Sequence, residues 1–324
     1  MRIGVIGAAG IAGRALIEPA RKVDEVEVAA VAARDPERAA KFAKEHEIPV
    51  VHRSYDELLA DDSLDAIYVP LANSLHAQWT IAALEAGHHV LCEKPFASNA
   101  AQAAEMVATA ERTGRVLVEA YHWRYHPVAD RMLELARAIG PLEELEARFS
   151  ISIPPENIRY DLALAGGSFM DLGCYCMHVA RTIAGGNPHV VSATAVEGPK
   201  GIDLSMEANL KFGDSLDAVV SCSMVGETSW PESMSVQARG RAGQLKVLNP
   251  MAPQWGHRIQ AELADGTTVD EVIEAAETSY DYQLRAFCRA LSGEGESLTG
   301  GADAIANMAA IDDVYTASGL GIRR

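Results

Sequence analysis

Over the first 120 residues, short and almost entirely apolar runs alternate with longer segments of helical periodicity. The apolar runs predict strands at 2–7, 26–33, 66–70, 89–92 and 116–120. The segments between them predict helices at 11–22, 36–46, 55–60, 75–86 and 100–113. Strands that are apolar on both faces and separated by helices are typical of a parallel sheet covered on both sides. The pattern therefore predicts a doubly wound α/β domain.

After about residue 121 the pattern changes to a strand-rich region that is typical of an antiparallel sheet. Candidate strands lie at 145–153, 190–196, 206–212, 217–224, 233–239 and 243–248, and candidate helices at 129–139, 172–184, 280–291 and 302–318. The Gly-Asp-Ser sequence at 213–215 fits a hairpin turn. We therefore expect two domains, residues 1–121 with the parallel sheet and residues 122–324 with a mostly antiparallel sheet. The last helix is amphipathic and is a candidate to pack back on the first domain.

The chain is acidic, with 28 Lys and Arg residues against 45 Asp and Glu residues and a net charge of −17. Phosphate backbones and anionic lipid surfaces repel such a protein, so a general nucleic-acid or membrane binder is disfavoured. The first residues lead directly into an apolar strand, and no apolar run approaches the roughly 20 residues of a membrane helix. We therefore expect a cytoplasmic protein with a small-molecule partner.

The five cysteines are odd in number, which fits reduced thiols better than a disulfide framework. Cys174, Cys176 and His178 have the residue types of a soft-metal site, but structural zinc sites usually show two such spaced pairs. His122 and His126 have the spacing of helical metal ligands without a carboxylate companion. We expect no metal, and we interpret the cysteine run as small buried residues of a helix.

A glycine-containing turn lies between the first predicted strand and the first predicted helix, and it reads Gly7-Ala8-Ala9-Gly10-Ile11-Ala12. This context is the one required of a dinucleotide-binding turn in a Rossmann domain. The first glycine of that motif makes the tight turn, the second permits close approach of the pyrophosphate, and the third position permits helix packing. Gly7 and Ala12 occupy the first and third positions, whereas Ala9 replaces the second glycine. The alternative is a small-residue turn of any α/β fold, but the context favours pyrophosphate binding at the helix N-terminus.

The end of the second predicted strand favours NADP over NAD. An NAD-binding domain usually has Asp or Glu at this point to bind the ribose 2′-hydroxyl. Here Arg34 follows the strand, and Arg38 lies one helical turn further on. A guanidinium can hold a 2′-phosphate with two hydrogen bonds. Asp35 is better explained as the N-cap of a helix that begins at Pro36, so we expect NADP, with NAD as the alternative.

Two further segments have residue types suited to acid–base chemistry. Glu93 and Lys94 directly follow a predicted strand, at the carboxyl edge of a parallel sheet where ligands bind. The commoner fate of such a lysine is a solvated position before a turn. Asp171 and Tyr175 lie four residues apart on one predicted helical face, after the glycine pair at 166–167. A neighbouring ammonium would lower the pKa of the phenol, whereas the alternative role of Asp171 is an N-terminal helix cap.

These segments together resemble the Gfo/Idh/MocA family, which includes glucose-fructose oxidoreductase and inositol dehydrogenase. The resemblance extends over nearly the whole chain and depends on the order and spacing of residues 7–12, 68–76, 93–95 and 166–175. It implies an N-terminal Rossmann domain and a C-terminal α/β domain with a large, open, mostly antiparallel sheet. In the family this sheet commonly forms subunit interfaces, so the resemblance implies a homodimer or homotetramer.

The resemblance also implies roles for individual residues. Lys94 matches the lysine of the family's Glu-Lys-Pro motif, Asp171 matches the acid of the second motif, and Tyr175 stands where many members have histidine. Tyrosine at this position resembles the sugar oxidoreductases and the dihydrodiol or aldose dehydrogenases, in which the Tyr–Lys pair does acid–base work. The loop that lies against the cofactor in the family is matched here by Leu71, Asn73 and His76, and the residue near the nicotinamide ribose by Glu93.

Residues 121–127, with the sequence YHWRYHP, resemble the substrate-side segment of the family. Trp123 offers a stacking face and Arg124 offers hydrogen-bond donors, both of which suit a polyhydroxylated ring. We therefore expect Lys94, Trp123, Arg124 and Tyr175 to bind the substrate. The alternative is that this segment is an interdomain packing cluster.

The favoured function is an NADP-preferring dehydrogenase that acts on a hydroxyl of a sugar, cyclic polyol or diol, with Tyr175 as acid/base, Lys94 as its modulator and Asp171 in support. A second hypothesis is a nicotinamide-dependent glycoside hydrolase whose turnover leaves the cofactor unchanged. A third is a non-catalytic sensor of NADP(H), because fold alone does not fix function. The presence of both Lys94 and Tyr175 argues against the sensor.

Overall fold

A computed structural model describes residues 1–226 and 231–324, and their contacts divide them into two units. The first unit consists of Met1–His122 and Tyr280–Ile305, and the second of Trp123–Ser279 and Ala306–Arg324. A single boundary was expected after residue 121. The structure differs from this expectation, because residues Tyr280–Ile305 belong to the first unit.

The physical reason for this grouping is the apolar face of helix α8, Ser279–Ser292. Tyr280, Leu284 and Phe287 of this helix are buried in the same hydrophobic cluster as Ile3 and Val5 of the first strand. The polar side of the helix adds an ion pair, in which Lys22 Nζ lies 2.9 Å from Asp281 Oδ2.

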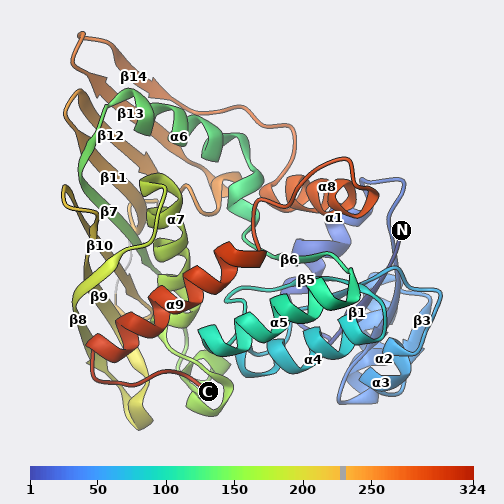
Figure 1. Cartoon of the computed structure of the whole chain (residues 1–324). Coiled ribbons are helices and arrows are strands. Elements are labelled where there is room, and N and C mark those ends of the chain that lie inside the picture. The colour runs from blue at the N-terminus through green and yellow to red at the C-terminus, as the bar shows by residue number, and fades with distance from the viewer. Residues whose placement is uncertain (227–230) are drawn as a thin grey trace. The chain divides into compact units, whose positions relative to one another are not determined.

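The first unit contains a six-stranded parallel sheet with the strand order β3-β2-β1-β4-β5-β6 (Figure 1). This observation confirms the predicted doubly wound sheet, and the order reverses between β1 and β4. Ligands of such sheets bind at the carboxyl ends of the strands, next to this reversal. The strands are β1 Arg2–Ile6, β2 Glu27–Ala32, β3 Val50–His52, β4 Ala66–Val69, β5 His89–Cys92 and β6 Leu117–Glu119.

Helices cover both faces of this sheet, and α4 and α5 pack against each other (Figure 1). Asp35 accepts hydrogen bonds from the backbone N–H groups of Glu37 and Arg38, so its interpretation as the N-cap of α2 is confirmed. The chain is helical over residues 11–20, with π-type hydrogen bonding over Gly13–Ile17 (η1) followed by α1, Glu18–Ala20. The remaining helices are α2 Pro36–His46, α3 Tyr55–Leu59, α4 Asn73–Glu85 and α5 Ala100–Thr113.

The second unit contains an eight-stranded sheet with the order β14-β13-β12-β11-β7-β10-β9-β8. The pair β7/β10 is parallel and the other neighbours are antiparallel, which confirms the predicted, mostly antiparallel sheet. The strands are β7 Leu142–Ser150, β8 His189–Glu197, β9 Asp203–Phe212, β10 Leu216–Ser223, β11 Met234–Gly240, β12 Gly243–Leu248, β13 Arg258–Leu263 and β14 Thr268–Glu271.

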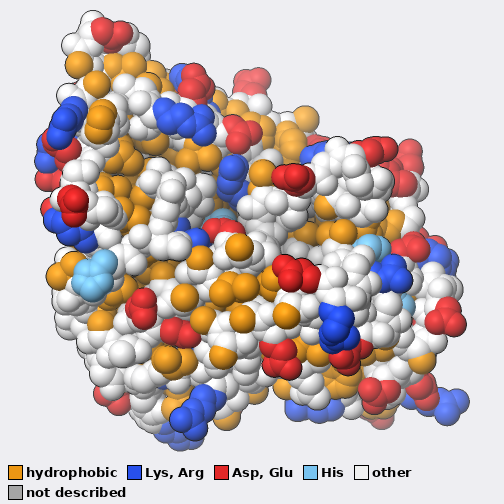
Figure 2. All heavy atoms as spheres, viewed as in Figure 1, with side chains coloured by type: hydrophobic (Ala, Val, Ile, Leu, Met, Phe, Trp, Pro, Cys, Tyr) orange, Lys and Arg blue, Asp and Glu red, His pale blue; other side chains and the backbone are white. Residues whose placement is uncertain are grey.

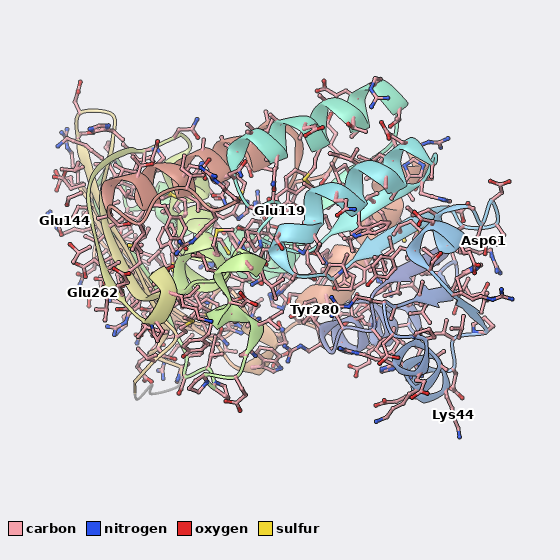
Figure 3. All side chains as sticks on the ribbon, turned by 90° about the horizontal axis from the view of Figure 1, so that it is seen from below. Lys44, Asp61, Glu119, Glu144, Glu262 and Tyr280 are labelled. Atoms are coloured by element: carbon pink, nitrogen blue, oxygen red, sulfur yellow. The ribbon has the colours of Figure 1, made fainter. Side chains whose placement is uncertain are left out.

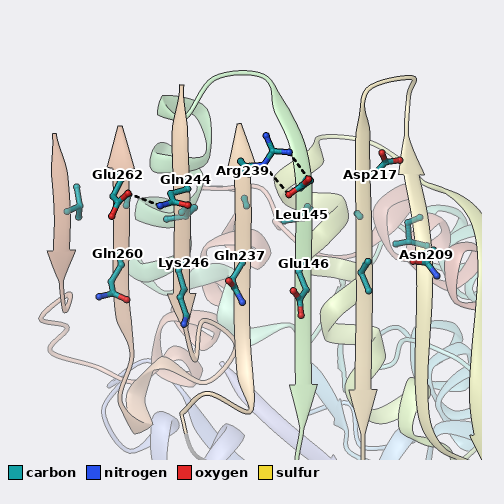
Figure 4. Close-up of a pocket in the computed structure, with 18 of the residues that line it drawn as sticks. Leu145, Glu146, Asn209, Asp217, Gln237, Arg239, Gln244, Lys246, Gln260 and Glu262 are labelled. Atoms are coloured by element: carbon teal, nitrogen blue, oxygen red, sulfur yellow. Dashed lines mark hydrogen bonds and ion pairs between the residues drawn. The ribbon is translucent and has the colours of Figure 1, made fainter. Parts of the chain in front are cut away.

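One face of this sheet is covered by α7, which packs on β7 and β10, and by α6, which packs on β12 and β13. The other face carries polar side chains such as Glu146, Gln237 and Lys246 (Figure 4). The helices and short helical turns from residue 122 onward are η2 His122–Tyr125, α6 Pro127–Ala138, η3 Ile158–Tyr160, η4 Leu162–Leu164, η5 Phe169–Gly173, α7 Cys174–Ala184, η6 Pro199–Gly201, η7 Pro253–Trp255 and α9 Gly301–Ala317.

Within the described ranges, no helix combines the length and apolar character needed to cross a membrane.

Acidic and basic side chains are interspersed over the surface in view in Figure 2. Some of these side chains form ion pairs between neighbouring strands of the second sheet. For example, Arg239 on β11 contacts Glu143 and Glu144 on β7.

Candidate active site

The turn after β1 has the geometry of a dinucleotide-binding turn. Gly7 has a φ of +99°, and a Cβ there would lie 2.7 Å from Leu71 Cδ2, so both conformation and space require glycine. Gly10 is exposed, and a Cβ there would meet no atom within 4 Å. The turn therefore leaves open space at Gly10, next to the start of the helix at Ile11. Leu71, which was predicted to lie on the cofactor side, contacts this turn.

The two arginines that were predicted to bind the 2′-phosphate occupy different positions. Arg38 donates from Nε and Nη2 to the Ala8 carbonyl oxygen, at 3.2 and 2.8 Å, and so joins α2 to the glycine turn. Arg34 is exposed directly after β2, and among the described residues its guanidinium has no hydrogen-bond or ion-pair partner. A free guanidinium at this strand end, with no acidic side chain held against it, fits a 2′-phosphate.

His76 connects two of the predicted cofactor-side segments. Its Nδ1 lies 2.8 Å from the Pro95 carbonyl oxygen and its Nε2 lies 3.1 Å from the Leu71 carbonyl oxygen. The side chain is fully buried, and burial lowers the pKa of His76 to about 4, so the ring is neutral at neutral pH. His76 therefore holds the backbone at Leu71 and the backbone at Pro95 together. Asn73 is the first residue of α4.

Glu93 lies in a buried polar cluster at the end of β5. Tyr68 Oη donates to Glu93 Oε1 at 2.6 Å. Burial raises the pKa of the Glu93 carboxyl, and the Tyr68 hydrogen bond opposes that rise. Tyr280 (Figure 3) interacts electrostatically with Glu93 and forms a hydrogen bond with Arg14. Sequence reasoning missed Tyr280 as a member of this cluster, because α8 lies almost 190 residues further along the chain.

Lys94 follows Glu93 at the tip of the segment and is half-exposed. The Lys94–Pro95 peptide bond is cis. The lysine charge interacts with the Glu93 carboxylate and opposes the rise that burial causes in the pKa of that carboxyl. Lys94 is thus an accessible cation beside a buried acid.

In the second unit, Asp171 lies inside a helical turn and does not cap a helix. Its backbone N–H donates to the Gly167 carbonyl oxygen at 3.2 Å, and its carboxylate forms an ion pair with Arg159. The helix start is instead bound by Asp203 of β9, which accepts from Phe169 N at 2.7 Å and from Ser168 Oγ at 2.9 Å. The cap alternative for Asp171 is therefore wrong.

Tyr175 lies one helical turn after Asp171 and is buried. Its ring packs edge-on against Phe149 of β7, with 5.7 Å between the ring centroids. Arg159 interacts electrostatically with both Asp171 and Tyr175, which raises the pKa of its own guanidinium. The three side chains form one cluster, which we call the Arg159–Asp171–Tyr175 cluster. Arg159 was not predicted, because no motif marks it in the sequence.

The glycine pair at 166–167 explains how Arg159 reaches this cluster. Gly167 N donates to the Arg159 carbonyl oxygen at 2.9 Å, and a Cβ at Gly166 would collide with that same oxygen. Gly167 has a φ of +129°, and a Cβ there would collide with the Asp203 carboxylate. Both glycines are therefore required by close approach of neighbouring chain segments.

The segment at 121–127 favours the packing alternative over a stacking face. Trp123 is fully buried, and its Nε1 donates to His178 Nδ1 at 3.2 Å. Arg124 lies 3.4 Å from the Asp130 carboxylate. His126 Nδ1 accepts from the backbone N–H of Val128 and caps α6. These contacts give Trp123, Arg124 and His126 structural partners within the second unit.

The cysteine run lies on α7 as predicted, and both of its thiols are buried. Cys176 Sγ donates to the Ser221 carbonyl oxygen, and burial raises the pKa of the Cys176 thiol. Across the described ranges, His, Cys, Asp and Glu side chains form no group of three or more arranged to hold a metal ion.

The predicted residues thus form two sets. The first unit gathers the glycine turn, the two arginines, the Leu71–His76 loop and Glu93–Lys94 at the carboxyl edge of its sheet. The second unit gathers Asp171 and Tyr175, with Arg159, at the start of α7.

Comparison with known proteins gives matches over most of the chain. Residues 1–121 match the family model "Oxidoreductase family, NAD-binding Rossmann fold", and residues 129–246 match the model "GFO/IDH/MocA C-terminal domain". The D-xylose 1-dehydrogenase (NADP(+)) 2 of Haloferax volcanii is 36% identical over 99% of this chain and 98% of its own length.

Two further matches are a curated relative and a solved structure. The dTDP-3,4-didehydro-2,6-dideoxy-alpha-D-glucose 3-reductase of Saccharopolyspora spinosa is 40% identical over 89% of this chain and 87% of its own. The crystal structure of a 3-ketoreductase from Actinomadura kijaniata, in complex with NADP and TDP-benzene, superposes with a TM-score of 0.89 at 27% identity. It covers 98% of this chain and 97% of that one.

Proposed function

The chain belongs to the Gfo/Idh/MocA oxidoreductase family, and on that premise we propose that it is an NADP(H)-preferring dehydrogenase of sugars, cyclic polyols or diols. It transfers a hydride between the nicotinamide and a carbon that carries a hydroxyl or carbonyl group. The observation that carries this proposal is the Arg159–Asp171–Tyr175 cluster, because it places a phenol beside an ion pair at the start of a helix. Relatives named as an NADP-dependent xylose dehydrogenase and a sugar 3-reductase support the substrate class.

The cofactor preference is supported by Arg34. Its guanidinium has no partner among the described residues, and the Asp35 beside it is engaged in capping α2. In the proposed complex, Arg34 binds the 2′-phosphate, Arg38 shapes the turn through Ala8, and the turn from Gly7 to Ala12 binds the pyrophosphate. Leu71, Asn73 and Glu93 contact the nicotinamide half of the cofactor. His76 holds the Leu71 and Pro95 backbone segments in place through its two hydrogen bonds.

When bound, NADP(H) supplies or accepts the hydride. Tyr175 exchanges the proton of the substrate hydroxyl at its phenolic oxygen, and Lys94 binds the substrate and tunes the phenol with its positive charge. Asp171 holds Arg159 and so keeps a fixed charge beside Tyr175. Arg124 remains a proposed substrate contact, whereas the burial of Trp123 supports a packing role for that side chain.

The test is cofactor absorbance with NADP or NAD and a panel of aldoses, inositols and cyclic diols that includes D-xylose. Lys94→Ala and Tyr175→Phe should each lower kcat by about 10²–10⁴-fold, because each removes a participant in proton transfer. Lys44→Ala is the matched control, because Lys44 is an exposed lysine of α2 (Figure 3). Full activity in Tyr175→Phe would contradict the proposal. So would glycoside cleavage without net cofactor reduction, which would favour the hydrolase.

We further propose that the protein forms a homodimer or homotetramer through the open face of the second sheet. This face forms a groove of about 940 Å³ that is lined by residues of all the strands from β7 to β14 (Figure 4). It combines acidic, basic and amide side chains, and Val191 beside them is 60% exposed. Light scattering should give a multiple of 34.6 kDa, and Gln237→Glu combined with Lys246→Glu should reduce it by like-charge repulsion. A monomeric wild-type protein would refute this assembly.

The five cysteines are all free thiols, which supports a reducing compartment such as the cytoplasm as the location.

A further inference from the structure

We propose that Arg159 is a positioning residue of the active site, which fixes the Asp171 carboxylate and sets the charge around the Tyr175 phenol. This inference rests on the proposed acid/base role of Tyr175 and deepens it. None of the sequence motifs includes Arg159, and its role follows from its contacts alone.

Arg159 is held in place by hydrogen bonds to Asn157 and Gly167. Asn157 Oδ1 accepts from both the backbone N–H and Nη1 of Arg159, each at 3.1 Å. On the other side, the Arg159 carbonyl oxygen accepts from Gly167 N at 2.9 Å. The backbone of Arg159 is thus fastened to the glycine pair that precedes the helix carrying Asp171 and Tyr175. An arginine held at both ends loses little further conformational entropy when it forms its ion pair.

Arg159 forms an ion pair with Asp171 and interacts electrostatically with Tyr175 and with the Cys174 thiol. From β7, the neighbouring strand contributes the uncharged ring of Phe149. The Asp171 carboxylate is 11% exposed, so solvent screens it only weakly. The positive charge of Arg159 favours the phenolate form of Tyr175, and the negative charge of Asp171 opposes it.

A charge within roughly 4–6 Å of a titrating group shifts its pKa by about 1–3 units. Arg159→Gln should therefore raise the pKa of Tyr175, because the positive charge that favours the phenolate is removed. Asp171→Asn should lower it, because Arg159 is then the unbalanced charge. The double variant should lie between the two, close to the wild-type protein.

The experiment is an ultraviolet titration of tyrosinate absorbance, which needs no substrate. Subtracting the Tyr175→Phe curve from the wild-type curve isolates one of the nine tyrosines. The same subtraction is made in the Arg159→Gln, Asp171→Asn and double-variant backgrounds. Burial raises the pKa of Tyr68, Tyr280 and Tyr315, and the subtraction removes their absorbance because all three are present in both proteins. Arg159→Lys keeps the charge and should return the midpoint toward that of the wild type.

The pH profile of kcat gives the functional readout on whichever panel member is oxidised. Arg159→Gln should move its acid limb upward by about one unit or more, a tenfold or larger loss of kcat at neutral pH that is recovered at high pH. Equal Tyr175 midpoints in the wild-type and Arg159→Gln backgrounds would overturn the inference. If Arg159→Gln does not fold, Asn157→Ala is the alternative variant, because it removes the hydrogen bond that holds the Arg159 guanidinium. Asn157→Ala should shift the Tyr175 midpoint in the same direction. An unchanged midpoint would overturn the inference. Full activity of Tyr175→Phe would instead overturn the proposed function, so the two failures are distinguishable.

Discussion

Replacing Asp203 by alanine is the strongest test of how the second unit supports its helix start. The carboxylate is fully buried and accepts four hydrogen bonds, from Ser168 Oγ at 2.9 Å, Phe169 N at 2.7 Å, Tyr315 Oη at 3.0 Å and Arg323 Nη2 at 2.7 Å. Arg323 is itself 3% exposed, so its charge has no access to water when Asp203 is removed.

The magnitude follows from these contacts. Removing one partner of a buried ion pair costs about 3–5 kcal/mol, because the other charge stays buried without its counter-ion. The donors of Ser168, Phe169 and Tyr315 also lose their acceptor, at about 1–3 kcal/mol for each one that stays unsatisfied. These costs overlap, so we expect Asp203→Ala to lower the free energy of unfolding by about 4 kcal/mol. With a urea slope of about 3 kcal/mol per molar, the midpoint should fall by about 1–1.5 M.

Urea unfolding followed by circular dichroism measures the effect. Asp270→Ala is the matched control, since Asp270 forms an exposed ion pair with Arg258 on the same sheet and its loss should change little. Asp203→Ala combined with Arg323→Met should recover part of the loss, because the buried charge that lost its counter-ion is then removed as well. The reasoning is refuted if Asp203→Ala and Asp270→Ala unfold at the same urea concentration.

Three further predictions concern the first unit. Arg34→Ala should weaken NADP binding by about 10–100-fold and leave NAD binding nearly unchanged, because about 1.5–3 kcal/mol of charge-assisted hydrogen bonding is lost; fluorescence titration measures both. Gly7→Ala should destabilise the turn by about 1–3 kcal/mol and abolish cofactor binding, since its φ of +99° and the nearby Leu71 exclude a Cβ; thermal unfolding with and without NADP checks this. The folded-state pKa of His76, about 4, lies below the unfolded value of about 6.5. The contribution of His76 to the free energy of unfolding is therefore complete above pH 6.5 and falls by about 2 kcal/mol by pH 5. Unfolding curves measured at pH 7.5 and pH 5 should accordingly lie closer together for His76→Gln than for the wild type. An equal separation in the two proteins would refute the reasoning.

The strands that sequence patterns predicted have buried apolar residues, except β8, which has none. The observed β5 and β12, at His89–Cys92 and Gly243–Leu248, have the predicted bounds. Three strands were missed, namely β3, β13 and β14. β3 has three residues, and β14 lies at the sheet edge with no buried residue, so neither presents an apolar period. β13 alternates correctly, but one of its two buried residues is Ala261, whose small side chain weakens the signal.

Site residues were predictable where chain-local geometry decides their position. Arg34, Lys94 and Tyr175 follow a strand end or a glycine loop directly, so the motif itself places them. Trp123 shows the opposite case, because an aromatic side chain at a domain junction has the same sequence signature whether it stacks on a ligand or is buried. Only its hydrogen bond to His178 and its lack of exposure distinguish the two.

Arg159 and Asp203 could not be predicted from the sequence, although both of them contact the glycine pair at 166–167. Glycine in a loop signals that something approaches closely or that φ is positive, but it does not say what approaches. In the structure, Gly166 admits the backbone of Arg159 and Gly167 admits the carboxylate of Asp203. One of these neighbours brings a charge to Asp171 and Tyr175, and the other binds the first N–H group of their helix. The two glycines therefore connect the charges of the Arg159–Asp171–Tyr175 cluster, the proposed acid–base site, to the buried ion pair of Asp203 and Arg323. A substitution at either glycine should consequently impair stability and proton transfer together, whereas Arg159→Gln should affect mainly proton transfer.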